Sequence, residues 1–245
     1  MSFPSLAWPL VLGVAGTAFV GGVSRGLTGF GNALVMAPVL MLMMPAEQAV
    51  VIISLNNLAT SGQFMRRSWA LADRSLLWPM LLAALPAIPV GVGLIGWVAP
   101  ELARRATGAA VMVLCLLLLF RPHAFGAPRP LKTVLVGIAS GLLTGFGGIG
   151  GPPSVLYVMG HAPDPDRARA TFIVYFSALY VAAAIIVGAM GLVGFTELAL
   201  ALVALPAFLA GGAAGARLFP LVASTRYREI VLAMLLLTGA LAAFR

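Results

Sequence analysis

The string LTGFG at residues 27–31 decides the fold, because the same five letters recur at residues 143–147. A second string, ALPA at residues 84–87, recurs at residues 204–207, in the same order along the chain. The two offsets are 116 and 120 residues. Two matches at nearly one spacing indicate an internal duplication, so we expect the chain to consist of two related halves.

The amino-acid composition indicates the class of protein to which the chain belongs. Hydrophobic residues make up 61% of the 245 residues and charged residues only 9%, with a mean hydropathy of +1.06. This excludes an ordinary soluble domain and predicts an all-α, polytopic integral membrane protein. The net charge of +8 does not indicate a nucleic-acid partner, because the basic residues fall in short loops between apolar blocks and form no continuous face.

Each half divides into about five apolar segments, which we expect to be helical. We assign the first repeat to residues 1–120, a cytoplasmic linker to residues 121–132 and the second repeat to residues 133–245, all within one integrated membrane domain. The segments of the first repeat are 6–24, 31–44, 46–65, 75–98 and 103–120, and those of the second are 131–145, 148–160, 167–190, 196–219 and 227–244.

The positive charges indicate how the segments cross the membrane, since cytoplasmic loops collect Lys and Arg. If the first two segments of each half form a hairpin that returns to its own side, eleven of the fifteen basic residues share one face. An odd number of crossings per half then inserts the second half upside down, which predicts inverted repeats. The eleven residues are Arg66, Arg67, Arg74, Arg121, Arg129, Lys132, Arg167, Arg169, Arg217, Arg226 and Arg228.

Glycine-dense stretches interrupt both predicted hairpins, at residues 21–32 and 137–153. Broken backbone inside a membrane is tolerated only where it is buried in protein or lines a wet cavity, so we expect the two breaks to meet near the bilayer midplane. The amides that begin the following helices favour an anion. The alternative is that these glycines only let helices pack closely. The candidate substrate-binding residues at the breaks are Thr28, Gly29, Phe30, Gly31, Asn32, Thr144, Gly145, Phe146, Gly147 and Gly148.

Arg25 is the one basic residue beside a glycine break, whereas all seven acidic residues lie at or beyond segment ends. An intramembrane arginine without a carboxylate partner is expected to bind an anionic substrate. Alternatively, Arg25 reaches to the headgroups, since Gly141 occupies the equivalent position in the second half. Asn57 and Ser177 occupy equivalent mid-segment positions and either face the cavity or bond to neighbouring helices.

Other chemistry finds little support in the sequence. Cys115 is the sole cysteine, and the two histidines lie far apart, so we expect no metal site and no cofactor. The G-x-G-x-x-G match at residues 145–150 lacks a preceding strand and a later acidic residue, so we expect no dinucleotide. We find no catalytic residues.

The two glycine-rich segments, with Pro38 after the first and Pro152 and Pro153 in the second, resemble those of the TauE/SafE family over essentially the whole chain. These proteins are sulfite exporter-like or toluene-sulfonate-uptake-like permeases. The resemblance implies transport of sulfite, sulfoacetate or another sulfonate across the membrane. Asn32 stands where the second half has Gly148, so the two breaks are not expected to be chemically equivalent.

Together these features predict a secondary transporter that moves a small anion across the inner membrane. The expected partners are that anion and the lipid bilayer, without nucleic acid, and the sequence leaves a homo-oligomer open. A passive anion channel remains the main alternative. An intramembrane enzyme and a purely structural subunit are weaker ones, because we find no nucleophile with a base and no ligand set.

Overall fold

Every regular element that the computed structural model describes is a helix, which confirms the all-α class. The structure describes residues 8–94, 128–147, 150–162, 164–222 and 224–244, together with residues 112, 113, 116 and 120. The predicted segment at 103–120 therefore lies largely outside the described residues. The helices are α1 (Trp8–Thr28), α2 (Asn32–Leu40), α3 (Ala46–Thr60), α4 (Met65–Leu71), α5 (Arg74–Leu94), α7 (Pro130–Gly147), α8 (Gly151–Met159), α9 (Pro165–Ala189), α10 (Phe195–Leu218), the 3₁₀ turn η1 (Phe219–Leu221) and α11 (Ser224–Phe244).

Four of the described helices are long and apolar enough to cross a membrane. They are α1, α5, α9 and the continuous stretch formed by α10 and η1. In contrast, α2 and α8 have nine residues each, which corresponds to about 14 Å at the helical rise of about 1.5 Å per residue. Each of these short helices therefore covers about half of a hydrocarbon layer about 30 Å thick.

The first hairpin turns at the glycine break between α1 and α2. Gly29 and Gly31 have φ angles of 86° and 85°, a region that side-chain-bearing residues rarely adopt. The chain thereby reverses, and α2 returns along α1 so that Met36 lies against Gly21. This packing agrees with the returning hairpin expected from the sequence.

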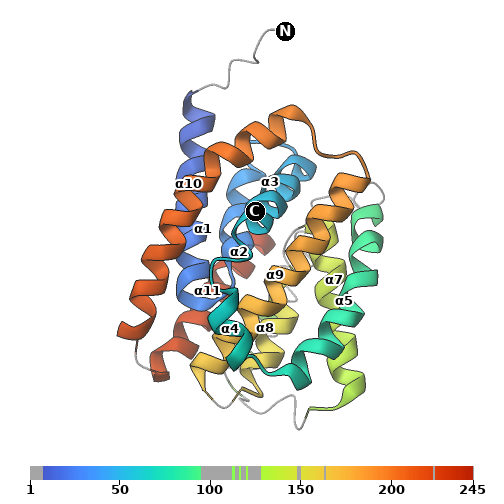
Figure 1. The fold of residues 1–245 in the computed structure, drawn as a ribbon, viewed down its shortest axis with the longest axis vertical. Coiled ribbons are helices and arrows are strands. Elements are labelled where there is room, and N and C mark those ends of the chain that lie inside the picture. The colour runs from blue at the N-terminus through green and yellow to red at the C-terminus, as the bar shows by residue number, and fades with distance from the viewer. Residues whose placement is uncertain are drawn as a thin grey trace.

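The second hairpin, formed by α7 and α8, returns in the same way. The hydroxyl groups of Thr133 on α7 and Tyr157 on α8 lie 2.8 Å apart, and the Ser140 hydroxyl donates to the Gly150 carbonyl at 2.5 Å. In Figure 1, α1 descends from the end of the molecule marked N, whereas α7 rises from the opposite end. The two hairpins therefore enter the molecule from opposite ends.

Each hairpin packs against a long helix from the other half of the sequence. Figure 1 shows α1 beside α10 at the left and α5 beside α7 at the right, and these are the two most extensive helix contacts described. Both pairs run parallel and approach through glycines. A methyl group at Gly141 would collide with the Ala84 carbonyl, and one at Gly22 would collide with the Phe208 carbonyl. The halves are therefore interleaved, and neither forms a separate packing unit.

Several element boundaries differ from the sequence expectation. Helix α1 extends to Thr28 instead of 24, α2 ends at Leu40 instead of 44, and α11 begins at Ser224 instead of 227. The segment expected at 46–65 ends at Thr60, and the short helix α4 follows a turn that contains Gly62. Helix α9 begins at Pro165 instead of 167, because the Asp164 side chain accepts a hydrogen bond from the Arg167 amide at 2.8 Å. Arg167 and Arg169 therefore lie in the first turns of α9.

The two glycine breaks come together in the interior. A methyl group at Gly151, the first residue of α8, would lie 3.9 Å from side-chain carbons of Phe30 and Leu34 on the first hairpin. The Phe30 ring also packs edge-on against Phe172 of α9, with 5.1 Å between ring centroids. Helix α9 packs in turn against α3, α4 and α5, so it connects both hairpins to the rest of the bundle.

Candidate functional site

A buried arginine joins three helices at the centre of the molecule. Arg25 lies one turn before the end of α1 and is 2% exposed. One terminal nitrogen, Nη1, donates to Oδ1 of Asn57 on α3. The other, Nη2, donates to Oγ of Ser177 on α9 at 3.0 Å. Three of the residues selected from the sequence thus form one hydrogen-bonded cluster, which we call the Arg25 cluster.

The geometry of the Arg25 cluster follows from the helices that bear it. The Asn57 amide nitrogen donates to the Ile53 carbonyl one turn earlier at 2.8 Å, which turns the amide oxygen toward the guanidinium. Both Asn57 and Ser177 are fully buried. They are separated by the same 120 residues as the ALPA strings, so the duplicated position supplies both acceptors of one arginine.

The positive charge of Arg25 has no carboxylate hydrogen-bonded to it among the described residues. Its third guanidinium nitrogen, Nε, carries an N–H group that is buried and bonded to no described acceptor. The side-chain amide nitrogen of Asn32, Nδ2, at the start of α2, is likewise buried without a described partner. A buried, unneutralised cation that retains an unbonded donor is the feature expected of a site for an anion.

The two threonines of the LTGFG strings bond back to the preceding helical turn, and the Thr28 hydroxyl also lies 3.0 Å from the Phe30 carbonyl oxygen in the first break. The Thr28 hydroxyl lies 2.8 Å from the Ser24 carbonyl oxygen, and the Thr144 hydroxyl lies 2.8 Å from the Ser140 carbonyl oxygen. Both serines also donate into their own break, Ser24 to the Phe30 carbonyl at 3.4 Å and Ser140 to the Gly150 carbonyl. These serines were missed, although their spacing of 116 residues equals that of the LTGFG strings.

The remaining residues selected at the breaks mostly make packing contacts. Gly29 lies against the backbone of Arg169, and its amide donates to the Arg25 carbonyl at 2.8 Å. Gly31 lies against Ser24 and Met234, and Gly145 against Ile88 and Gly91. Phe146 is half-buried, Gly147 ends α7, and Gly148 lies outside the described residues.

The end of α1 is held by two side chains that the sequence did not single out for this role. The Arg169 guanidinium donates to the Gly26 carbonyl, and the Tyr227 hydroxyl donates to the Thr28 carbonyl at 2.7 Å. The Arg169 guanidinium also lies 4.3 Å from the centre of the Phe219 ring. The Asp164-Pro165 helix start places Arg169 in the first two turns of α9.

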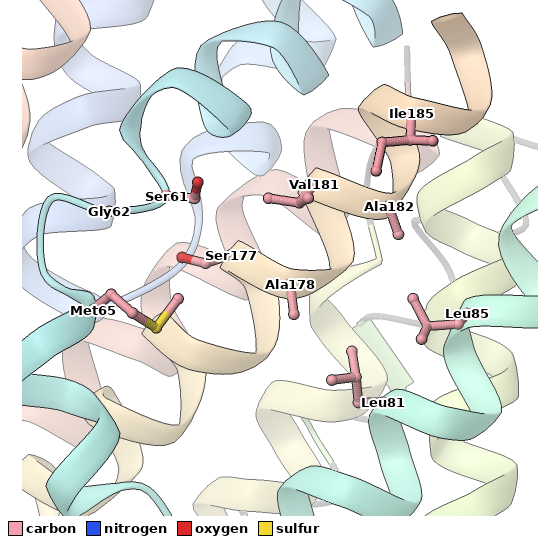
Figure 2. A pocket seen from close by; sticks show the side chains of 10 residues that line it. All are labelled: Ser61, Gly62, Met65, Leu81, Leu85, Ser177, Ala178, Val181, Ala182 and Ile185. Carbon is pink, nitrogen blue, oxygen red and sulfur yellow. The ribbon is translucent and has the colours of Figure 1, made fainter. Parts of the chain in front are cut away.

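An open pocket of about 400 Å³ lies next to the Arg25 cluster. Figure 2 shows α9 along its floor, with the turn between α3 and α4 on one side and α5 on the other. Ser177 belongs to both features, because it accepts from Arg25 and also lines the pocket. Among the residues that the structure describes, no group of His, Cys, Asp or Glu side chains could hold a metal ion.

Comparison with known proteins identifies the family of this chain. Residues 14–242 match the family model described as Sulfite exporter TauE/SafE. Comparisons with curated proteins and with solved structures gave no match. The family match covers nearly the whole chain, and the described helices include four of membrane-spanning length. The chain therefore belongs to the TauE/SafE family of multi-pass membrane transporters for sulfur-containing anions.

Proposed function

We propose that this protein is a secondary transporter of the bacterial inner membrane that binds sulfite or a sulfonate beside Arg25. The observation that carries the proposal is the buried Arg25 guanidinium, which is bonded to two neutral oxygens and retains an unpaired N–H group. Burying an unneutralised charge is costly, so this arrangement favours a state in which a substrate anion supplies the missing negative charge.

The arrangement of the two hairpins supports an alternating-access cycle. In this proposal residues 1–120 and 133–245 are inverted repeats, and the anion lies where their glycine breaks meet. Support comes from the reciprocal packing of α1 on α10 and of α5 on α7, and from hairpins that enter from opposite ends. Two nearly equivalent arrangements, open to opposite sides, would then interconvert around one fixed site. The direction of net transport follows from the gradients of the anion and its coupling ion.

The test is anion flux into liposomes that contain the purified protein. Sulfite, sulfate, sulfoacetate, taurine, an aryl sulfonate and acetate are compared, with and without a pH gradient, for the native chain, Arg25→Ala and Arg25→Lys. We expect saturable flux of a sulfur-containing anion, lowered at least about tenfold in Arg25→Ala, because a hydrogen bond to a charged group contributes about 1.5–3 kcal/mol. Lysine retains the charge but loses the two-nitrogen geometry, so an intermediate flux is expected.

Arg66→Ala is the matched control, because Arg66 is an exposed arginine on α4. Its removal changes the net charge by the same amount and should leave flux within about twofold. Flux that rises linearly with concentration and never saturates would indicate a channel. If the folded native protein moves none of these anions, the proposal is wrong.

A further inference from the structure

Helices α1 and α9 are joined by two arginine side chains that run in opposite directions. Arg25 of α1 donates to the Ser177 hydroxyl of α9 at 3.0 Å. Arg169 of α9 donates to the Gly26 carbonyl of α1 at 2.5 Å. Arg169 and Ser177 are eight residues apart on α9, which corresponds to about 12 Å at the helical rise. The two bonds therefore join the same two helices at different depths.

The Arg169 bond belongs to a cluster of three side chains, Arg169, Phe219 and Tyr227, which we call the Arg169 latch. The Arg169 guanidinium lies 4.3 Å from the centre of the Phe219 ring, and this ring packs edge-on against Tyr227 with 5.7 Å between ring centroids. The Tyr227 hydroxyl donates to the Thr28 carbonyl at 2.7 Å. Carbonyls in the last turn of a helix lack partners within that helix. The latch supplies donors to two of them, at Gly26 and Thr28, and so ties the end of α1 to α9 and α11.

The latch lies between the Arg25 cluster and one end of the molecule. Arg169 and Phe219 are half-buried, whereas Tyr227 and Arg25 are each 2% exposed. Figure 1 shows α4 and the starts of α9 and α11 at the end opposite to the one marked N. We call this the arginine-rich end, because the sequence predicts it to be cytoplasmic from its basic residues. The exposed arginines on the elements that reach it are Arg66, Arg67, Arg217 and Arg226.

The duplication repeats neither of the two arginines. The offset of 120 residues that relates Ser177 to Asn57 leads from Arg169 to Ala49 of α3, whose side chain has no hydrogen-bond donor. Gly141 likewise stands where the first half has Arg25. The two hairpins therefore share a backbone plan but differ in what holds their ends, so a latch of this kind is expected at one end of the molecule and not at the other.

We propose that the Arg169 latch is a gate between the Arg25 cluster and the arginine-rich end, and that it opens when α9 withdraws from α1. The inference rests on the proposed function and adds the contact that moves. Helix α1 is held against α10, because their backbones are so close that a methyl group at Gly26 would collide with the Gly212 carbonyl. An anion that binds the Arg25 guanidinium in place of Ser177 would release one of the two arginine bonds between α1 and α9 and leave the latch to be opened.

Reaction of a single cysteine with a membrane-impermeant methanethiosulfonate tests the gate. Ser24→Cys in a Cys115→Ser background places a thiol one turn deeper along α1 than Thr28, at a position that is 7% exposed. The reagent is applied to membrane vesicles of either orientation, so that each face is tested alone. Arg169→Gln and Phe219→Ala should each speed the reaction at least about tenfold from the arginine-rich end, because a hydrogen bond to a charged group contributes about 1.5–3 kcal/mol. The rate from the other face should stay within about twofold.

Arg167→Gln and Leu221→Ala are the matched controls. The Arg167 side chain is 56% exposed on the same helix as Arg169, and Leu221 is 79% exposed in the same 3₁₀ turn as Phe219. Both controls should leave the rates from both faces within about twofold. Phe219→Ala removes no hydrogen bond of Arg169, so it tests the gate even where Arg169→Gln fails to fold. A rate that is unchanged in the latch variants, or that rises equally from both faces, would overturn the gate.

The labelling needs no substrate, so its outcome is separate from that of the proposed function. Saturable sulfite flux together with unchanged labelling in the latch variants would refute the gate and leave the transporter in place. Labelling that is accelerated from the arginine-rich end alone, in a protein that moves none of the tested anions, would refute the transporter and retain the latch as the barrier beside Arg25.

Discussion

Arg169 and Gly26 are 143 residues apart in sequence, yet the Arg169 Nη2 atom donates to the Gly26 carbonyl oxygen at 2.5 Å. The Nε atom lies 3.2 Å from the same oxygen. Gly26 immediately follows Arg25, so this contact fixes the last turn of α1 directly beside the Arg25 cluster. A cation at a helix C-terminus also interacts favourably with the helix dipole.

Replacing Arg169 with Gln should therefore loosen the end of α1. We expect a loss of roughly 1.5–3 kcal/mol of unfolding free energy, since a hydrogen bond to a charged group is removed. Thermal unfolding of the purified protein in detergent measures this loss of unfolding free energy. Arg167→Gln is the control, because the Arg167 side chain is 56% exposed and lies 3.9 Å from Asp164, an arrangement that contributes about 1 kcal/mol or less. Equal stability of the two variants would contradict this role for Arg169.

Asn57→Asp should convert the Arg25 cluster into a permanent ion pair. The side chain has nearly the same shape as asparagine, and a carboxylate at Asn57 Oδ1 would neutralise Arg25 without a substrate. We expect the variant to fold and to lose at least about tenfold in anion flux, because its carboxylate competes with the substrate for the guanidinium. Flux in proteoliposomes, measured with thermal unfolding in detergent, distinguishes a blocked site from a misfolded protein. Native-like flux would place the substrate away from Arg25.

Gly141→Ala should separate α5 from α7. A methyl group at Gly141 meets the Ala84 carbonyl oxygen and two backbone carbons within van der Waals distance, so the helices must move apart. We expect a loss of about 1–3 kcal/mol, as for other overpacked contacts, measured by thermal unfolding. Gly16→Ala is the matched control, because nothing described lies within 4 Å of a methyl group there. In that variant alanine should be neutral or stabilise α1 by up to about 1 kcal/mol. The same response in both variants would rule out close packing at Gly141.

Much of this arrangement could be predicted from the duplicated sequence strings. The LTGFG strings located both chain reversals. The structure brings together Arg25, selected as the basic residue beside a glycine break, and the equivalent mid-segment residues Asn57 and Ser177. These predictions succeeded because a polar group within an apolar helix needs a partner, which limits where it can lie. The prediction that these residues bind a substrate stays a prediction.

Other contacts form only where helices approach each other in three dimensions, and the sequence carries no comparable signal for them. Arg169 resembled an ordinary cytoplasmic arginine, because its acceptor is a backbone carbonyl and no acidic side chain is involved. The bonds of the Thr28 and Thr144 hydroxyls to carbonyls one turn earlier were also not predicted, since the sequence does not indicate whether such a hydroxyl bonds to its own helix or faces a cavity. The pocket that Ser177 lines is formed by three elements, and no sequence motif predicts it.

The pairing of α1 with α10 also affects how the chain is made. Gly22 of α1 meets its partner Phe208 only after about 190 further residues have been synthesised, which takes on the order of 10–40 s at typical translation rates. During that interval α1 holds Arg25 in the insertion machinery or in lipid without Asn57, and then without Ser177. Chains that stop before α9 would retain an arginine that lacks both of its hydrogen-bond acceptors or one of them, and such fragments are expected to be substrates for membrane proteases.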